Sequence, residues 1–164
     1  MQVRTSDGVH ITLAGGEWVA SWLLPQVAGI FESTYHALTP YRLCDTRNGN
    51  PSSLAGIYTQ CNGRPLIGGV PYNVSTSTAG ATGAGHIPPG ATSVVLNVTI
   101  IDPTSYGYLT ISPAGIARPL SSNINFTPGE LAANQVVVEP GLDGQVAAYL
   151  STGFANMTID VEGY

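Results

Sequence analysis

Short apolar stretches separated by turn-forming residues fill most of the chain after residue 36, and this pattern limits the possible folds more than any other feature. In SVVLNVTII (93–101) every second residue from Val94 to Ile100 is apolar, and the intervening face is largely apolar as well. This predicts a central strand buried on both faces. GYLTIS (107–112) follows the turn sequence DPTSYG (102–107), which predicts a hairpin.

The series of strands continues to the end of the chain. NINF, NQVVVEP and QVAAYLS are separated by the turn sequences PGE and GLDG. In the last stretch, ANMTIDVEGY, the odd-numbered residues from Ala155 to Val161 are expected to point inward and the even-numbered ones outward. This spacing predicts an all-β fold over 36–164, an antiparallel β-sandwich of jelly-roll-like type. The Gly-, Ala- and Thr-rich segment 76–90 is expected to be an exposed loop.

The chain is poor in charge. Charged residues make up 9%, against roughly 25% in an average soluble protein. The net charge is −5. Nucleic acids and anionic membrane surfaces are bound by clustered basic residues, so neither is an expected partner. The apolar stretch 18–31 is short and interrupted by Pro25 and Gly29, so no membrane insertion is expected.

Residues 1–35 differ from the rest and are interpreted as a short N-terminal appendage. A turn at 6–8 precedes VHITLA (9–14), whose alternation predicts a strand. EWVASWLLPQVAGIF follows and holds both tryptophans of the chain. The large apolar residues expected to dock on a partner are Trp18, Trp22, Leu23, Leu24 and Phe31. The alternative, that they pack on the chain's own domain, stays open.

Cys44 and Cys61 are the two cysteines of the chain. No further Cys or His lies at the short spacing that a zinc site needs, and there is no redox CxxC. The two cysteines flank a loop rich in Gly, Asn, Pro and Ser, which predicts a disulfide that closes this loop. The bond should contribute roughly 3 kcal/mol, and it indicates an oxidising or extracellular setting.

The stretch TPYRLCDTRNGN (39–50) gathers Arg42, Asp45 and Arg47 in a chain that otherwise has little charge. We expect a structural ion-pair cluster in which Asp160, or Glu162 beside it, is the partner from the far end of the chain. In an extended segment a bidentate contact between Asp45 and Arg47 is less natural than such a tertiary pair.

No recognisable catalytic set accompanies this cluster. Catalysis needs a nucleophile with a base, or paired carboxylates, and the histidines at 10, 36 and 86 lie far apart without metal-ligand spacing. The chain has no lysine for Schiff-base chemistry, no phosphate-binding glycine loop and no calcium-loop pattern. We therefore expect no enzyme activity, no metal and no cofactor.

Asparagines occur in or beside the predicted strands, where this residue is disfavoured: Asn97, Asn123, Asn125 and Asn134. Buried amides must be hydrogen-bonded, so these side chains are expected to satisfy backbone groups at bulges or strand ends. An alternative interpretation is a sugar-binding surface in which the amides act together with tyrosines such as Tyr106, Tyr108 and Tyr149.

Four segments in order carry a resemblance to a known family: TPYRLCDTRNG with Cys61 after it, PPGATSVVLNVTIIDPTSYGYLTISPAG, RPLSSNINFTPGELAANQVVV and GFANMTIDVEGY. Together they resemble the β-rich accessory domain of actinobacterial exported proteins and of actinobacteriophage decoration and tail proteins. The resemblance implies a non-catalytic domain. It assigns structural roles to Arg42, Asp45, Thr46 and Arg47, and to Asn97, Asn125, Asn134 and Asp160.

Members of this family that are secreted carry a signal sequence and a larger partner domain, whereas this chain starts at Met1 with a short apolar appendage. The expected function is therefore that of a phage virion component, a capsid decoration or tail protein on the virion surface. Its expected partners are copies of itself and major capsid or tail proteins. The alternative is an extracellular, cell-wall-associated module that binds carbohydrate, with a host surface polysaccharide as its partner.

Overall fold

The structure is a computed structural model that describes residues 21, 34–78 and 85–164. The chain divides into two units, Met1–Tyr35 and His36–Tyr164. The second unit, called the β-domain below, contains every strand described here. Within the described residues, no helix is long and apolar enough to cross a lipid bilayer.

In the residues that the structure describes, the β-domain forms nine strands and two short 3-10 helices. In chain order these are β1 (Ala37–Asp45), η1 (Gly56–Cys61), β2 (Leu66–Ile67), β3 (Pro71–Ser75), β4 (Val94–Ile101), β5 (Gly107–Pro113), β6 (Ile124–Phe126), β7 (Leu131–Val138), η2 (Leu142–Gly144), β8 (Gln145–Leu150) and β9 (Phe154–Gly163).

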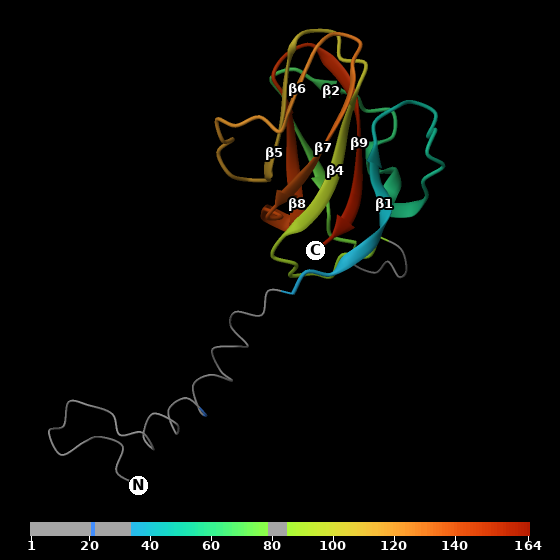
Figure 1. Cartoon of the computed structure of the whole chain (residues 1–164). Helices are drawn as coiled ribbons and strands as arrows, with labels where there is room; N and C mark the ends of the chain where they lie inside the picture. The colour runs from blue at the N-terminus through green and yellow to red at the C-terminus, as the bar shows by residue number, and fades with distance from the viewer. Residues whose placement is uncertain (1–20, 22–33, 79–84) are drawn as a thin grey trace, which may run out of the picture. The chain divides into compact units, whose positions relative to one another are not determined.

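The strands form two antiparallel sheets (Figure 1). One sheet has the order β1-β9-β4-β7, with the two-residue β2 paired to the start of β9. The other has the order β3-β8-β5-β6. The prediction of an all-β antiparallel sandwich is therefore confirmed.

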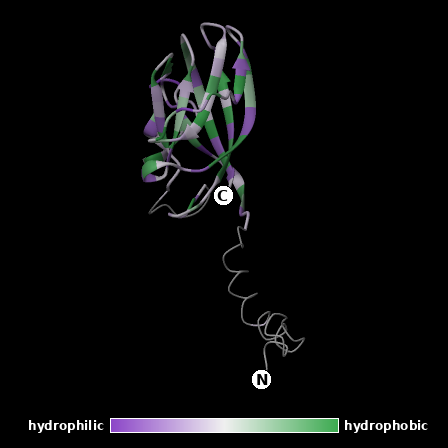
Figure 2. Ribbon diagram, turned by 90° about the vertical axis from the view of Figure 1, so that its left-hand side faces the viewer, coloured by the Kyte–Doolittle hydropathy of each residue, from purple (hydrophilic) through white to green (hydrophobic). Residues whose placement is uncertain are grey.

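The core lies between the sheets. Along β4 the residues Val94, Leu96, Val98 and Ile100 are fully buried, and along β9 the side chains of Met157, Ile159 and Val161 are fully buried too. Figure 2 shows this alternation as hydrophobic and hydrophilic bands along the strands. Each fully buried aliphatic side chain of this size contributes about 1.5–3 kcal/mol.

Two details of burial differ from the sequence-based expectation. The second face of β4 is only partly buried, although it is largely apolar and the strand is central. This face looks away from the other sheet. Thr158 was expected to point outward, yet it is 2% exposed, and its partners on the flanking strands are Asp45, which is buried, and Thr99.

The predicted hairpin at 102–107 is wrong. β4 belongs to one sheet and β5 to the other, so this connection crosses from sheet to sheet instead of joining neighbouring strands. A hairpin within one sheet and a connection between two sheets can use the same turn residues. A turn sequence specifies a reversal of the chain but not the sheet that the next strand joins.

The expectation of an exposed loop at 76–90 holds at Pro89 and Gly90, which are exposed, but is wrong around 76–78 and 85–87. Thr76, Thr78 and Ile87 are 1–2% exposed. Thr78 Oγ1 accepts a hydrogen bond from the Ile87 amide at 2.7 Å and lies 3.2 Å from the Ile87 carbonyl oxygen. One threonine hydroxyl thus connects the chain at 78 to the chain at 87.

Candidate functional site

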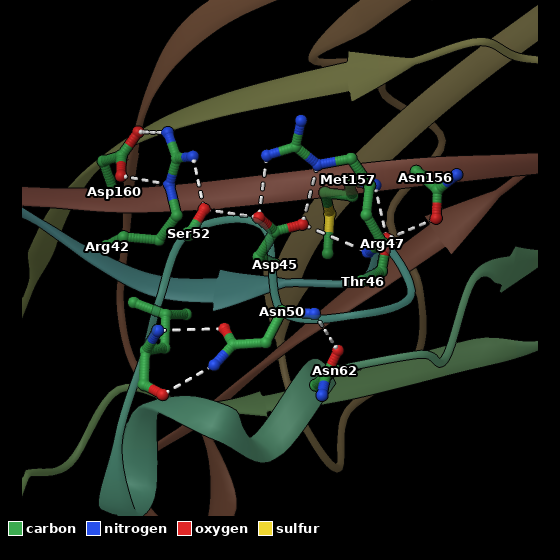
Figure 3. Close-up of polar contacts among 11 residues, drawn as sticks. Arg42, Asp45, Thr46, Arg47, Asn50, Ser52, Asn62, Asn156, Met157 and Asp160 are labelled. Carbon is green, nitrogen blue, oxygen red and sulfur yellow. Dashed lines mark hydrogen bonds and ion pairs between the residues drawn. The ribbon is translucent and has the colours of Figure 1, made fainter.

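The charged cluster lies on β1 and β9, where the two strands pair. Arg42 is directly opposite Asp160 in the strand register. Its Nε and Nη2 atoms donate to the two carboxylate oxygens of Asp160 at 2.8 and 2.9 Å (Figure 3). The hydrogen bonds to this carboxylate raise the pKa of Arg42. The tertiary partner expected from the end of the chain is therefore the one that Arg42 contacts.

Asp45 and Arg47 form a second ion pair, which corrects the expectation that a bidentate contact between them is less natural than a tertiary pair. Arg47 Nε donates to Asp45 Oδ1 at 3.0 Å and Nη2 donates to Oδ2 at 2.8 Å. The expectation assumed an extended segment, but β1 ends at Asp45. There the chain turns, and the Arg47 amide also donates to Asp45 Oδ1 at 3.1 Å. An aspartate that accepts the amide two residues on is a common turn device.

Ser52 joins the two pairs into one cluster. Its hydroxyl accepts a hydrogen bond from Arg42 Nη1 at 3.1 Å and donates to Asp45 Oδ2 (Figure 3). The strand register is irregular between Arg42 and Cys44. This irregularity interrupts the alternation of β1, so that Leu43, Cys44 and Asp45 are buried in succession. We call Arg42, Asp45, Arg47, Ser52 and Asp160 the clamp.

Asp45 is the most buried charged group of the clamp, with 1% of its side chain exposed. Burial by itself would raise the pKa of this carboxyl group. The hydrogen bonds from Arg47 and Ser52 outweigh that effect and lower the pKa from 3.8 to about 2. The carboxylate is therefore ionised at neutral pH with its oxygens occupied by donors, and it serves to hold the chain.

Thr46 fixes the next residue of the chain to β9. Its hydroxyl accepts a hydrogen bond from the Met157 amide at 2.7 Å and donates to Asn156 Oδ1 at 3.2 Å. The Thr46 amide donates to the Met157 carbonyl oxygen at 3.0 Å. The residue is fully buried. The sequence Asp45-Thr46-Arg47 thus supplies structural contacts at each of its three positions.

The disulfide Cys44–Cys61 is present, as predicted. It connects β1 to the end of η1, across a sequence separation of 17 residues. Within the closed loop, the Asn50 side chain bonds both the amide and the carbonyl of Leu54, at 2.9 and 2.8 Å. The loop is therefore held by a covalent bond at its ends and by an amide side chain at its centre. A disulfide fits an oxidising environment.

Gln60 is a structural residue that sequence reasoning missed. Its Nε2 donates to the carbonyl oxygens of Leu43, at 3.1 Å, and of Ser75, at 3.0 Å. Its Oε1 accepts from the Ser75 amide at 2.8 Å. One side chain thus joins β1 of one sheet to β3 of the other. A lone glutamine in a loop gives no signal of this role in the sequence.

The asparagines near β5 and β6 satisfy backbone groups. Asn123 Oδ1 accepts from the Ile111 amide at 2.7 Å, and Asn134 Nδ2 donates to the Asn123 carbonyl oxygen at 2.7 Å. Asn125 instead accepts from the Ser122 hydroxyl at 3.0 Å. The first two contacts agree with a structural role, and the third leaves Asn125 at the surface.

The three tyrosines of the possible sugar surface are arranged differently from one another. Tyr108 lines a cavity of about 290 Å3 together with Leu120, Ser122 and Asn125. Tyr149 lies on the neighbouring strand, under the Arg118 guanidinium, whose carbon is 4.2 Å from the ring centroid.

Tyr106 lies in the connection before β5 and is 74% exposed. Of the three tyrosines, the structure therefore places Tyr108 in a cavity with polar side chains, while the face of Tyr149 is covered by an arginine.

The expected docking residues Trp18, Trp22, Leu23, Leu24 and Phe31 lie outside the described residues. Among the described residues there is no group of three or more His, Cys, Asp or Glu side chains that could hold a metal ion.

Comparison of the chain with protein-family models, curated proteins and solved structures finds no match. The functional argument therefore depends on the residues themselves.

Proposed function

We propose that the protein is a non-catalytic structural component of an actinobacteriophage particle, a capsid decoration or tail protein. The β-domain projects from the particle, and residues 1–35 dock on capsid or tail proteins or on other copies of the chain. The proposal combines the resemblance carried by four segments of the sequence with the contacts of the β-domain.

The observation that carries the proposal is the clamp. It contains the charged side chains that would be the first candidates for chemistry in this domain. Each of them is instead engaged in hydrogen bonds that hold β1 and the turn after it. Charge that is fixed in bidentate contacts with donors and acceptors satisfied is typical of structural clusters. The disulfide beside it adds resistance to unfolding outside the cell.

Two measurements test the proposal. Mass spectrometry of purified particles of the source phage should detect the protein at a fixed ratio to the major capsid or tail protein. Sedimentation velocity should show a defined oligomer for the full chain and a monomer for a chain that lacks residues 1–35. Absence from purified particles would refute the proposal.

A second candidate function is binding of a cell-wall polysaccharide, and the cavity at Tyr108 favours it. Protein sites for small molecules combine an aromatic wall with a few polar groups. Here Tyr108 supplies the ring, Ser122 and Asn125 supply hydroxyl and amide groups, and Leu120 is 97% exposed at the rim. These are the groups that a neutral sugar ring needs for stacking and hydrogen bonding.

This candidate is tested by retention on insoluble actinobacterial cell-wall material. Tyr108→Ala should lose retention, because it removes the aromatic wall. Tyr106→Ala is the matched control, since Tyr106 is an exposed tyrosine that does not line the cavity. Equal retention of the two variants would eliminate the cavity as a sugar site.

A further inference from the structure

Tyr108 and Tyr149 lie on one face of the β3-β8-β5-β6 sheet. In β8 every second residue is buried, and Tyr149 belongs to the other, partly exposed set. In β5 Tyr108 precedes Leu109, which is fully buried and pairs with the buried Leu150 of β8. Successive side chains of a strand point to opposite faces of the sheet. Both tyrosine rings therefore lie on the outer face of this sheet, away from the core.

Arg118 connects the two rings. Its guanidinium carbon is 4.2 Å from the ring centroid of Tyr149, and its Nη1 lies 3.5 Å from the Tyr108 hydroxyl oxygen and 3.4 Å from the Pro119 carbonyl oxygen. In the described parts of the chain, no hydrogen bond of Nε or Nη2 is found. A guanidinium that stacks on an aromatic ring keeps the N–H groups along its edge available to an acceptor.

No carboxylate of the described residues neutralises this arginine. The ion pairs found among residues 34–78 and 85–164 involve Arg42 and Arg47 but not Arg118. Both of those arginines donate to an aspartate through two nitrogen atoms. Arg118 has the same planar group, exposed and held against an aromatic ring, and it lacks such a partner within the described chain. Its position therefore suits a carboxylate supplied by a ligand.

The segment 114–123, which carries this arginine, is fixed to the sheet near both ends. At its start the Ala114 amide donates to the Gln145 carbonyl oxygen at 3.1 Å. Near its end the Ser121 carbonyl oxygen accepts a hydrogen bond from the hydroxyl of Thr110, a fully buried residue of β5. A segment that is already ordered loses less conformational entropy when a ligand binds.

The cavity described above and the guanidinium share one side chain. The Tyr108 ring lines the cavity, and its hydroxyl group lies beside Arg118. None of the residues that line the cavity is charged: Tyr108, Leu120, Ser121, Ser122 and Asn125. A ligand in the cavity thus meets neutral polar and apolar groups there, with a guanidinium next to them. This combination fits a sugar ring that carries one acidic group.

We propose that the Tyr108 cavity binds an acidic saccharide, through a uronic acid unit whose carboxylate pairs with Arg118. The sugar ring packs on Tyr108, and its hydroxyl groups bond to Ser122 and Asn125. A carboxylate matches the planar guanidinium in a bidentate contact, and its one negative charge balances the one positive charge. A phosphate ester, with a charge of about −2, is matched less well by one arginine. The inference rests on the second candidate function and adds the charge of the ligand.

A titration of the full chain at low ionic strength, followed by NMR chemical shifts, tests the inference. The probes are a panel of hexuronic acid trisaccharides and the neutral hexose trisaccharides of the same linkage. The wild type should bind an acidic trisaccharide about fivefold more tightly than its neutral counterpart, the upper range for an exposed ion pair. Because salt screens exposed charges, about 1 M salt should remove most of this preference.

Substitutions separate the charge from the ring. Arg118→Gln should bind the acidic and neutral trisaccharides equally, whereas Arg118→Lys should keep part of the preference because it keeps the charge. Tyr108→Ala should lose binding of both. Arg64→Gln is the matched control: this arginine also lies over a tyrosine, 5.2 Å from the ring centroid of Tyr72, but outside the cavity. It should behave as the wild type.

Three results would overturn the inference. The first is a wild type that binds neutral and acidic trisaccharides equally, in which case the second candidate function stands without a charge requirement. The second is a preference for the acidic probe that persists in Arg118→Gln. The third is tighter binding of a phosphorylated trisaccharide than of the uronic acid one. If no probe binds, the inference is refuted, and retention on cell-wall material decides the second candidate function separately.

Discussion

Replacing Asp45 by asparagine tests whether the clamp stabilises the β-domain through its buried charge. Asp45→Asn keeps the shape of the side chain but removes the negative charge that receives hydrogen bonds from Arg47 and Ser52. Arg47 is left without its partner, although its side chain is 37% exposed and can be hydrated. The substitution therefore isolates the contribution of the ionised Asp45 carboxylate.

The magnitude follows from the pKa of Asp45. The value falls from 3.8 to about 2 in the folded protein. At about 1.4 kcal/mol per pKa unit, this corresponds to about 2 kcal/mol of folding free energy at neutral pH. Because the folded-state pKa is the lower one, this stability is fully present above about pH 4. It is lost as the pH falls from about 4 through about 2, where the folded-state carboxyl group takes up its proton.

The assay is urea unfolding of the full chain at several pH values between 2 and 7. Far-UV circular dichroism should report it, because both tryptophans, at 18 and 22, lie outside the β-domain. The wild type should exceed Asp45→Asn by about 2 kcal/mol at pH 7 and by less than about 1 kcal/mol at pH 2. Glu139→Gln, at an exposed carboxylate, is the control. A wild-type advantage that does not change with pH would refute the reasoning.

Three further substitutions have defined expectations. Replacing Cys44 and Cys61 by alanine should lower the unfolding free energy by about 3 kcal/mol in urea, and a reductant should then have no further effect. Gly141→Ala should cost about 1–3 kcal/mol in the same assay, because the new Cβ would lie 2.1 Å from the Ala114 carbonyl oxygen. Gln60→Ala should cost about 1–3 kcal/mol and speed hydrogen exchange at the Ser75 amide, which loses its acceptor.

The fold class could be predicted from the sequence because the two central strands alternate strongly. β4 and β9 each bury a row of apolar side chains at every second position. This alternation can be read from each segment alone, without knowing which strands lie beside it. The assignment of strands to sheets could not be predicted. β4 and β5 are joined by a turn sequence that would serve a hairpin equally well, and the sheet that each strand joins depends on packing across the whole core.

The clamp was predictable only in part. The Arg42–Asp160 contact joins opposite charges on two predicted strands. Because the chain has few charged residues, few other partners for Arg42 were available, and the sequence was enough to suggest this one. The pairing of Asp45 with Arg47, and the link through Ser52, depend on where β1 ends and on its register irregularity. Neither property is visible in a strand pattern. Gln60 gave no signal at all, because its partners are backbone groups.

The position of these contacts has a common physical reason. Among the strands of the described residues, β1 is an outer one that pairs with β9 alone, and this pairing joins the two ends of the β-domain. Because more than 100 residues separate the paired strands, closing this contact carries a large loop-closure cost. The clamp, the disulfide and Gln60 all act on β1 and compensate for this cost. Gln60 also bonds both backbone groups of Ser75 on β3, so that the strand with the longest closure is tied to the opposite sheet as well as to β9.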